Sequence, residues 1–216
     1  FQCDTEEDFV SKVLEGQPES PSYFKQMKRM NCDGPPILDG LPLLQSLEPK
    51  ILHDVLLSDN AVIVDIRDAA SFNAGHFPGT ISIPLSKSFS TWCGWLLPYN
   101  QPVYLIAEGH NSVSEAARDL ALIGIDDISG FFDMEALEYC SVSGIGLENG
   151  KSIDWLEAER AVRDEKACMV DVRGMSEWDE GHVPGARHLH LGQLQDRGPL
   201  ELPRGCPLLL YCRSGY

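Results

Sequence analysis

The sequence predicts an α/β fold with two parallel-sheet domains, helices on both faces of each sheet, and a second domain that is incomplete at its C-terminal end. The first supporting observation is an internal repeat. The segment VIVDIRDAASFNAGHFPGTISIPL from Val62 is followed by MVDVRGMSEWDEGHVPGARHLHL from Met169, and such a repeat sets the architecture before other signals. The second is that continuous apolar strands such as VIVDI and VYLIA alternate with helical patterns, as in parallel sheets covered on both faces.

The two copies align without a gap at an offset of 106 residues (Asp65 to Asp171), and each then reaches an apolar strand that opens with proline. They share an Asp-x-Arg motif and a Gly-His-x-Pro-Gly motif: Asp65 and Arg67, Gly75 to Gly79, Asp171 and Arg173, and Gly181 to Gly185. Because the Asp and Arg recur in both copies, we expect a buried pair or a hydrogen-bond anchor. For the same reason, His76 and His182 are expected to shape the loop rather than to catalyse.

Repeat one is expected to form a complete domain at about residues 43–140. A helix around 44–57 precedes the strand VIVDI, the loop through AGHFPG, the short strand ISIPL and the strand VYLIA. The segment SVSEAARDLALIG predicts a helix with a capping box from Ser112 to Glu115 and an end at Gly124. The last strand comes from IDDISGFF. The apolar segment TWCGWLLPY has no counterpart in repeat two, and we expect it to pack against a neighbouring domain.

Repeat two follows a segment rich in Gly and Ser, residues 141–152, which is expected to be a linker. The helix IDWLEAERAV opens the second domain, residues 153–216, and two strands and the apolar strand LLLYC follow. By analogy with the first copy, repeat two is expected to lack a helix and a final strand. We therefore expect the sequence to be a fragment of a longer protein.

Residues 1–42 belong to neither repeat. EEDFVSKVLEG predicts a short amphipathic helix that ends at Gly16, with Phe9, Val13 and Leu14 on one side. SYFKQMKRM predicts a second helical piece. Two short helices cannot bury their apolar faces alone, so this segment is expected to be the tail of an upstream domain or a strap across repeat one.

Charge and composition exclude several classes of protein. The net charge of −16 argues against nucleic acid or an anionic membrane surface as partner, because both need a basic face. No apolar run reaches the roughly 18 residues of a membrane span. The seven cysteines contain no CxxC pair and nothing that resembles a zinc site, and they indicate a reducing compartment such as the cytoplasm. His188 and His190 lie on one face of a strand, but no third metal ligand can be assigned.

Cys212 is the one cysteine whose local sequence predicts reactivity. LLLYCRSGY places it at the carboxyl end of an apolar strand, followed by a loop that contains glycine; ligands bind at this edge of an open parallel sheet. Such a loop can point successive backbone N–H groups at the sulfur, and a following helix adds partial positive charge. Both features, together with the charge of Arg213, favour the nucleophilic thiolate. The alternative is a buried structural cysteine.

Over residues 43–216 the chain resembles the rhodanese family. The motifs that carry the resemblance are Asp171 and Arg173, Gly181-His182-Val183-Pro184-Gly185, and Cys212-Arg213-Ser214-Gly215. The resemblance implies two rhodanese-like domains, no cofactor in this chain, and transfer of a sulfane sulfur through a persulfide on Cys212. Arg213 would then attract the anionic donor, and the N–H groups of Ser214, Gly215 and Tyr216 would hold the persulfide anion.

Repeat one matches the same motifs except at the loop, where Ala107 and Glu108 replace Cys and Arg. An alanine cannot carry sulfur, and a carboxylate would repel an anionic donor. The first domain is therefore expected to be inactive.

Within residues 1–42, EEDFVSKVLEGQPESPSYFKQMKRMNCDGPP resembles the stretch that closes the metallo-β-lactamase-fold domain of persulfide dioxygenase-like proteins with rhodanese repeats. The resemblance implies an upstream domain of that fold as a partner. Zinc or iron would be held there, since the histidine-rich ligand motif of such domains is absent from this chain.

The leading hypothesis is a sulfurtransferase that takes sulfur from a small anionic donor, either a persulfide, a polysulfide or thiosulfate, and passes it to a thiol or cyanide. Assembly as a homo-oligomer is left open. One alternative is a non-catalytic interaction or regulatory module, which suits repeat one. The other is a related Cys-loop phosphatase, whose longer loop holds phosphate.

Overall fold

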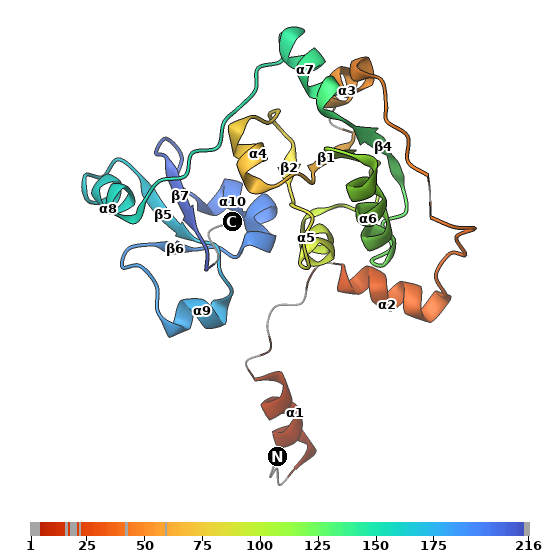
Figure 1. Ribbon diagram of the computed structural model, residues 1–216. Helices are drawn as coiled ribbons and strands as arrows, with labels where there is room; N and C mark the ends of the chain where they lie inside the picture. The colour runs from red at the N-terminus through yellow and green to blue at the C-terminus, as the bar shows by residue number, and fades with distance from the viewer. Residues whose placement is uncertain are drawn as a thin grey trace. The chain divides into compact units, whose positions relative to one another are not determined.

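A computed structural model describes residues 5–15, 17, 21, 23–41, 43–58 and 60–213, without the side chains of residues 195, 196 and 199. The chain divides into two compact units (Figure 1). One is residues 22–152, and the other contains residues 153–216 together with the segment up to residue 21. Helix α1 (Glu6–Leu14) begins at Thr5, whose hydroxyl accepts a hydrogen bond from the Asp8 N–H at 3.1 Å. Gly16, expected to end this helix, lies outside the described residues.

Repeat one contains a four-stranded parallel sheet in the order β2-β1-β3-β4. The strands are β1 (Val62–Asp65), β2 (Ile81–Ser82), β3 (Val103–Ile106) and β4 (Ile128–Phe132). The helices of this unit are α2 (Phe24–Asp33), α3 (Pro49–Leu56), α4 (Ala69–Ala74), α5 (Phe89–Leu96), α6 (His110–Ala121) and α7 (Met134–Val142).

Both faces of this sheet are covered by helices. One cluster of buried residues joins β1 and β3 to α5 and α6, and includes Val64, Leu105 and Ala117. The other joins the sheet to α3 and α7, which lie side by side in Figure 1, and includes Leu52 and Phe132. Continuous apolar strands are therefore buried on both sides, as expected for parallel sheets.

Two local expectations for repeat one are wrong. The helix expected from residue 44 begins at Pro49, because the residues before it run beside β4, where the Leu47 N–H bonds to the Phe131 carbonyl at 2.9 Å. Ser112 does not cap α6. The helix already begins at His110, and the Ser112 hydroxyl donates to the Gly109 carbonyl at 2.8 Å, one turn back.

The apolar segment TWCGWLLPY packs on its own sheet. It forms most of α5, in which Phe89 and Cys93 are fully buried in the cluster with Val64. Ser141 and Val142 of the expected linker complete α7. The rest runs back along repeat one, where Glu148 and His76 exchange backbone hydrogen bonds of 2.8 and 3.0 Å.

Repeat two contains a three-stranded parallel sheet in the order β6-β5-β7. The strands are β5 (Cys168–Asp171), β6 (Arg187–His188) and β7 (Leu208–Tyr211). The helices are α8 (Trp155–Arg163), α9 (Met175–Glu180), the short 3₁₀ helix η1 (Leu191–Gln193) and α10 (Leu194–Glu201). Among the described residues, this unit has no strand beyond β7 that would correspond to β4.

The two sheets share one topology and one register, which confirms the predicted fold class. Asp65 of β1 pairs with Ile106 of β3, and Asp171 of β5 pairs with Tyr211 of β7. The hydrogen bonds to the following strand also match. Leu189 donates its N–H to the Asp171 carbonyl at 2.9 Å, as Ile83 does to that of Asp65 at 3.0 Å.

The two units differ in how one face of the sheet is covered. In repeat one, Val103 and Leu105 of β3 are fully buried, together with residues of α6. In repeat two, Leu208 and Leu210 at the corresponding positions of β7 are 37% and 51% exposed. In the described part of repeat two, this face of β7 is therefore partly open.

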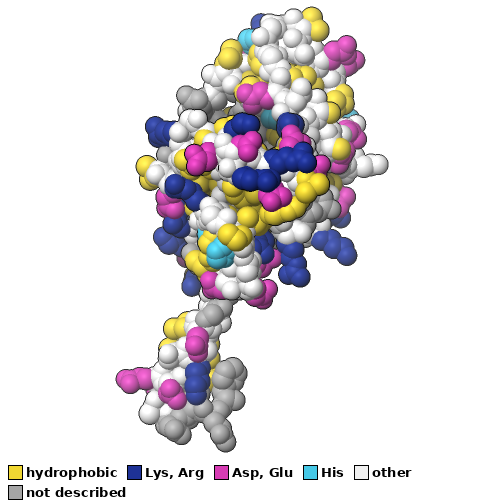
Figure 2. Space-filling view, turned by 90° about the vertical axis from the view of Figure 1, so that its left-hand side faces the viewer, with side chains coloured by type: hydrophobic (Ala, Val, Ile, Leu, Met, Phe, Trp, Pro, Cys, Tyr) yellow, Lys and Arg dark blue, Asp and Glu magenta, His cyan; other side chains and the backbone are white. Residues whose placement is uncertain are grey.

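Acidic and basic side chains are interspersed on the face of the molecule seen in Figure 2, with hydrophobic side chains between them. The net charge of −16 is thus not gathered in one patch on that face. No helix within the described ranges is long and apolar enough to cross a membrane.

Candidate active site

Cys212 follows β7 directly, at the carboxyl edge of the sheet and beside the end of β5, where Asp171 lies. The connection after β5 leads to β6 on one side, whereas β7 lies on the other side. The carboxyl edge between β5 and β7 is therefore a topological switch point, where open α/β sheets bind their ligands. Cys212 is partly buried and packs against the cluster of Val170, Val172 and Leu189. Ser214, Gly215 and Tyr216, the rest of the predicted anion-binding loop, lie outside the described residues.

The Asp-x-Arg motif forms the same ion pair in both repeats. Arg173 donates from Nε to Oδ1 of Asp171 at 3.0 Å and from Nη2 to Oδ2 at 2.6 Å. Arg67 makes the same two bonds to Asp65, at 2.9 and 2.6 Å. Nη2 of each arginine also donates to the carbonyl of the glycine that opens the Gly-His-x-Pro-Gly loop, at 2.8 Å in repeat two and 3.0 Å in repeat one. The pair thus ties the end of the first strand to that loop.

The electrostatics of this pair favour its charged form. Burial acts to raise the pKa of Asp171, but the hydrogen bonds from the Arg173 guanidinium and N–H outweigh it and hold the pKa below its usual value. The hydrogen bond to Asp171 in turn raises the pKa of Arg173. Because the guanidinium donates to Asp171 and Gly181, its described contacts are to the protein's own scaffold.

The two loop histidines are held in the same way. His182 lies with Nδ1 3.0 Å from the Trp178 carbonyl, and its ring stacks on the Trp178 ring at 3.4 Å between centroids. His76 lies 3.0 Å from the Phe72 carbonyl and stacks on Phe72 at 3.8 Å. Both rings are engaged by the turn of helix that precedes the loop.

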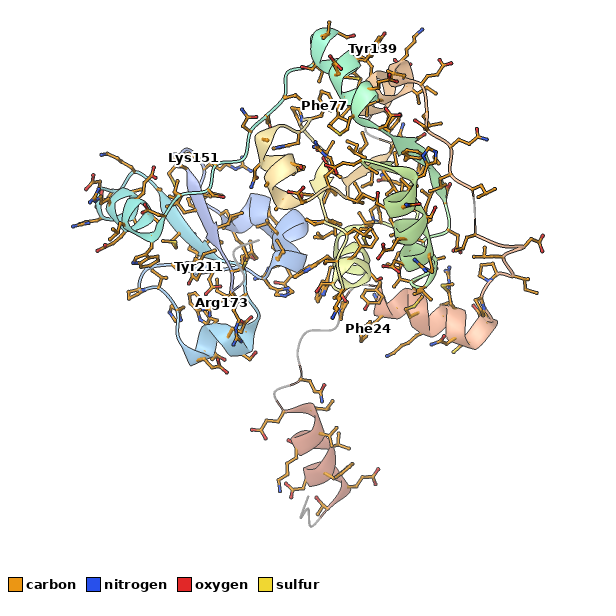
Figure 3. All side chains as sticks on the ribbon, in the orientation of Figure 1. Phe24, Phe77, Tyr139, Lys151, Arg173 and Tyr211 are labelled. Atoms are coloured by element: carbon orange, nitrogen blue, oxygen red, sulfur yellow. The ribbon has the colours of Figure 1, made fainter. Side chains whose placement is uncertain are left out.

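Tyr211 is a site residue that the sequence analysis missed. Its hydroxyl accepts a hydrogen bond from the Val183 N–H at 3.2 Å. Burial, together with the nearby Asp171 carboxylate, raises the pKa of Tyr211. The Arg173 guanidinium lies 5.6 Å from the centre of its ring, and both side chains are labelled in Figure 3. Tyr211, which directly precedes Cys212, therefore links the end of β7 to the Gly-His-x-Pro-Gly loop. The signal in the sequence was a tyrosine in an otherwise apolar strand.

Repeat one makes the corresponding connection with apolar groups. Ile106 occupies the position of Tyr211, and Phe77 that of Val183. Both are buried in one cluster with Phe132. The loop is thus held by packing in repeat one, and by a hydrogen bond from Val183 to the Tyr211 hydroxyl in repeat two.

The residue after the cysteine position differs in charge between the repeats. Arg213 is 83% exposed, and its Nη1 lies 3.8 Å from Oε1 of Glu177 in α9. In repeat one the corresponding pair is Glu108 and Ser71, whose hydroxyl lies 3.5 Å from the carboxylate. Repeat two therefore has an exposed cation directly after Cys212, where repeat one has a carboxylate.

Ala107 has no exposed surface and belongs to the buried cluster beneath α6. Its N–H donates to the Phe132 carbonyl at 3.0 Å. The position of the cysteine in repeat two is thus filled by a core residue in repeat one, with neither a nucleophile nor access to solvent.

The His188 ring is held by contacts within repeat two. His188 Nε2 lies 2.8 Å from the Arg173 carbonyl, and its ring packs near Trp178. Within the part of the chain that the structure describes, no group of three or more His, Cys, Asp or Glu residues could hold a metal ion.

Comparison with known proteins identifies the family to which this fold and site belong. The family model of the rhodanese-like domain matches residues 48–134 and 152–216. YrkF of Bacillus subtilis, a candidate sulfur carrier protein, is 32% identical over 72 residues, which are 32% of this chain and 38% of YrkF. The uncharacterized protein YqhL of the same organism is 41% identical over 49 residues, 23% of this chain and 38% of YqhL.

Among solved structures, a metallo-beta-lactamase from Staphylococcus aureus is 33% identical to this chain, with a TM-score of 0.50. The match covers 61% of this chain and 36% of that protein. The chain therefore spans less than half the length of each of these relatives.

Proposed function

The chain belongs to the family of rhodanese-like domains, and on that premise we propose that its second repeat is a sulfurtransferase with Cys212 as the nucleophile. The Cys212 thiolate attacks the terminal sulfur of a persulfide, polysulfide or thiosulfate. The sulfur–sulfur bond of the donor breaks, and the donor leaves as a thiolate or as sulfite. An acceptor thiolate or cyanide then attacks the terminal sulfur of the Cys212 persulfide, and Cys212 leaves as a thiolate.

The observation that carries this proposal is the position of Cys212. It stands at the switch point of the parallel sheet, on the strand next to the Asp171–Arg173 anchor, where open α/β sheets bind their ligands. A thiol placed there meets a bound donor at the edge where a loop can hold its negative charge.

The neighbouring residues have distinct proposed roles. Arg213 attracts the anionic donor, and its contact with Glu177 is weak enough to be exchanged for a donor, because both groups reach solvent. The backbone N–H groups of Ser214, Gly215 and Tyr216 hold the persulfide anion. Tyr211 is a positioning residue that fixes the strand end from which Cys212 projects.

Repeat one acts as a non-catalytic module in this proposal. Ala107 offers no sulfur, and Glu108 places a negative charge where repeat two has Arg213. Its role is structural or docking.

We further propose that the chain works with a metallo-β-lactamase-fold domain located upstream, which holds zinc or iron and shares the persulfide. The 33% identity to the metallo-beta-lactamase from Staphylococcus aureus supports this partner. A reducing compartment such as the cytoplasm suits a persulfide carrier.

The test is turnover of thiosulfate and of glutathione persulfide, with cyanide or glutathione as acceptor. We expect Cys212→Ser to lower turnover by at least about a thousandfold, whereas Cys32→Ser, at an exposed cysteine, leaves it unchanged. Retained turnover in Cys212→Ser protein would contradict the mechanism. Hydrolysis of an aryl phosphate without sulfur transfer would indicate that the protein is a Cys-loop phosphatase. If wild-type protein neither transfers sulfur nor hydrolyses the aryl phosphate, the chain is a non-catalytic interaction module.

A further inference from the structure

Repeat two contains a second pair of sulfur atoms that the proposed transfer does not use. Sγ of Cys168 and Sγ of Cys206 lie 2.7 Å apart, and both residues are partly buried. Cys168 is the first residue of β5, and Cys206 belongs to the turn that leads into β7. The pair therefore joins the amino ends of two strands, whereas Cys212 lies at the carboxyl end of β7.

The backbone holds these two cysteines next to each other. The Cys168 N–H donates to the Pro207 carbonyl at 2.9 Å, and Cys168 is the register partner of Leu208. Gly205 has a φ of +86°, a left-handed conformation that favours glycine and turns the chain so that Cys206 faces β5. The two sulfur atoms need only a small side-chain rotation to reach a bond length of about 2.0 Å.

The groups around the pair act on Cys206 in opposite directions. The hydrogen bond with Cys168, together with burial, raises the pKa of Cys206, while the positive charge of Arg187 acts to lower it. Arg187 is fixed beside the pair by its hydrogen bond to the Glu201 carbonyl at 3.0 Å. A nearby cation stabilises any thiolate that forms in the pair.

The pair is specific to repeat two. The corresponding positions in repeat one are Val62 and Gln101. Cys93 and Cys140 of repeat one are each buried in different hydrophobic clusters, on opposite sides of the sheet. A purely structural role for sulfur at this place in the fold would not explain why only the repeat with the candidate nucleophile has it.

We propose that Cys168 and Cys206 form a redox-active dithiol, which closes to a disulfide by exchange with low-molecular-weight disulfides such as oxidised glutathione. In the first step, the Cys168 thiolate attacks one sulfur of the disulfide, the sulfur–sulfur bond breaks, and one glutathione leaves as a thiolate. In the second step, Cys206 gives up its proton to solvent and attacks Sγ of Cys168, and the second glutathione leaves. The two cysteines are oxidised by two electrons, and the glutathione disulfide is reduced by two.

The disulfide would act on the strand that carries Cys212. In the described part of repeat two, β7 pairs with β5 alone, and its Leu208 and Leu210 are partly exposed. A covalent bond between Cys206 and the start of β5 closes a loop across 38 residues and restrains the separation of β7 from β5.

The direct test is a titration of the protein with mixtures of reduced and oxidised glutathione, followed by alkylation and peptide mapping. We expect a disulfide-linked peptide pair that contains Cys168 and Cys206, while exposed Cys32 forms only a mixed disulfide with glutathione. Cys206→Ser should leave Cys168 as a mixed disulfide, and Cys32→Ser should leave the linked pair unchanged. Wild-type protein in which Cys168 and Cys206 carry only glutathione, or in which either is joined to another cysteine, would overturn the proposal.

A second measurement tests the effect on β7. Hydrogen exchange of the amides from Leu208 to Tyr211 should slow by about tenfold or more in the oxidised protein. The corresponding β3 amides in repeat one serve as an internal control and should not change. Equal exchange of β7 in the oxidised and reduced protein would show that the bond does not restrain the strand.

Discussion

The two repeats keep the same scaffold but differ along one strand. The ion pair between Asp and Arg, its bond to the loop glycine, and the histidine stacked on the preceding helix have nearly the same geometry in both. The differences at the carboxyl edge lie on β3 and β7 and at the residues that follow them. There, Ile106, Ala107 and Glu108 of repeat one correspond to Tyr211, Cys212 and Arg213 of repeat two.

This distribution separates what the fold needs from what chemistry needs. A residue that both repeats share is explained by its role in the fold, because repeat one lacks the cysteine that catalysis would need. The residues that differ are a polar anchor, a nucleophile and a cation in repeat two, and buried or acidic residues in repeat one. Substitutions at matched positions can therefore test each half of the comparison.

The largest expected effect on stability comes from the shared ion pair. Arg67→Ala leaves the fully buried Asp65 carboxylate without its guanidinium partner, and we expect it to destabilise repeat one by about 3–5 kcal/mol. Arg173→Ala should cost less, because the Arg173 side chain is 17% exposed, against 4% for Arg67. Hydrogen exchange of the β1 and β5 amides reports each repeat separately. A larger loss for Arg173→Ala would contradict the comparison.

The second effect concerns the open face of β7. Leu105→Ala removes a fully buried side chain from repeat one and should cost about 2–5 kcal/mol. Leu210→Ala, at the matched position with 51% exposure, should cost less than about 1 kcal/mol. Urea unfolding followed by hydrogen exchange in each repeat measures both. Equal losses would mean that the face of β7 is covered in solution.

The smallest effect concerns the polar anchor of repeat two. Tyr211→Phe keeps the ring but leaves the Val183 N–H without its acceptor, at a cost of about 1 kcal/mol. If Tyr211 positions Cys212, the rate of sulfur transfer should fall by more than the loss of folded protein explains. The kcat should fall, while the KM for thiosulfate should stay nearly unchanged. The control is Tyr139→Phe, at a tyrosine that is 46% exposed in repeat one, which should change neither quantity.

Much of this could be predicted from the sequence, because the repeat places each motif twice. The strands, their parallel order and the placement of Cys212 at a strand end follow from local hydrophobic pattern and from the offset between the copies. The residues missed are those whose role depends on contacts between distant segments. Tyr211 bonds to Val183, which is distant in the sequence. Cys168 contacts Cys206, 38 residues later, and no short sequence motif indicates that the two cysteines are close.

The ends of helices and linkers are not set by local composition alone. The sequence predicts a helix cap at Ser112, but α6 begins at His110, shortly after β3 ends at Ile106. The Gly- and Ser-rich segment after residue 141 suggested a linker, yet Glu148 pairs with His76 of the loop in repeat one. The bridge to His76 shows that a segment of linker-like composition can still pair with a folded domain.

The central claim is that the same scaffold is reactive only where it carries Cys212. It is tested most directly by mapping persulfide on wild-type and Ala107→Cys protein after treatment with glutathione persulfide and trapping by alkylation. We expect one added sulfur atom on Cys212 in both proteins and none at position 107, because Ala107 is fully buried and followed by Glu108. Persulfide at position 107 as abundant as on Cys212, or none on Cys212 in the wild type, would contradict it.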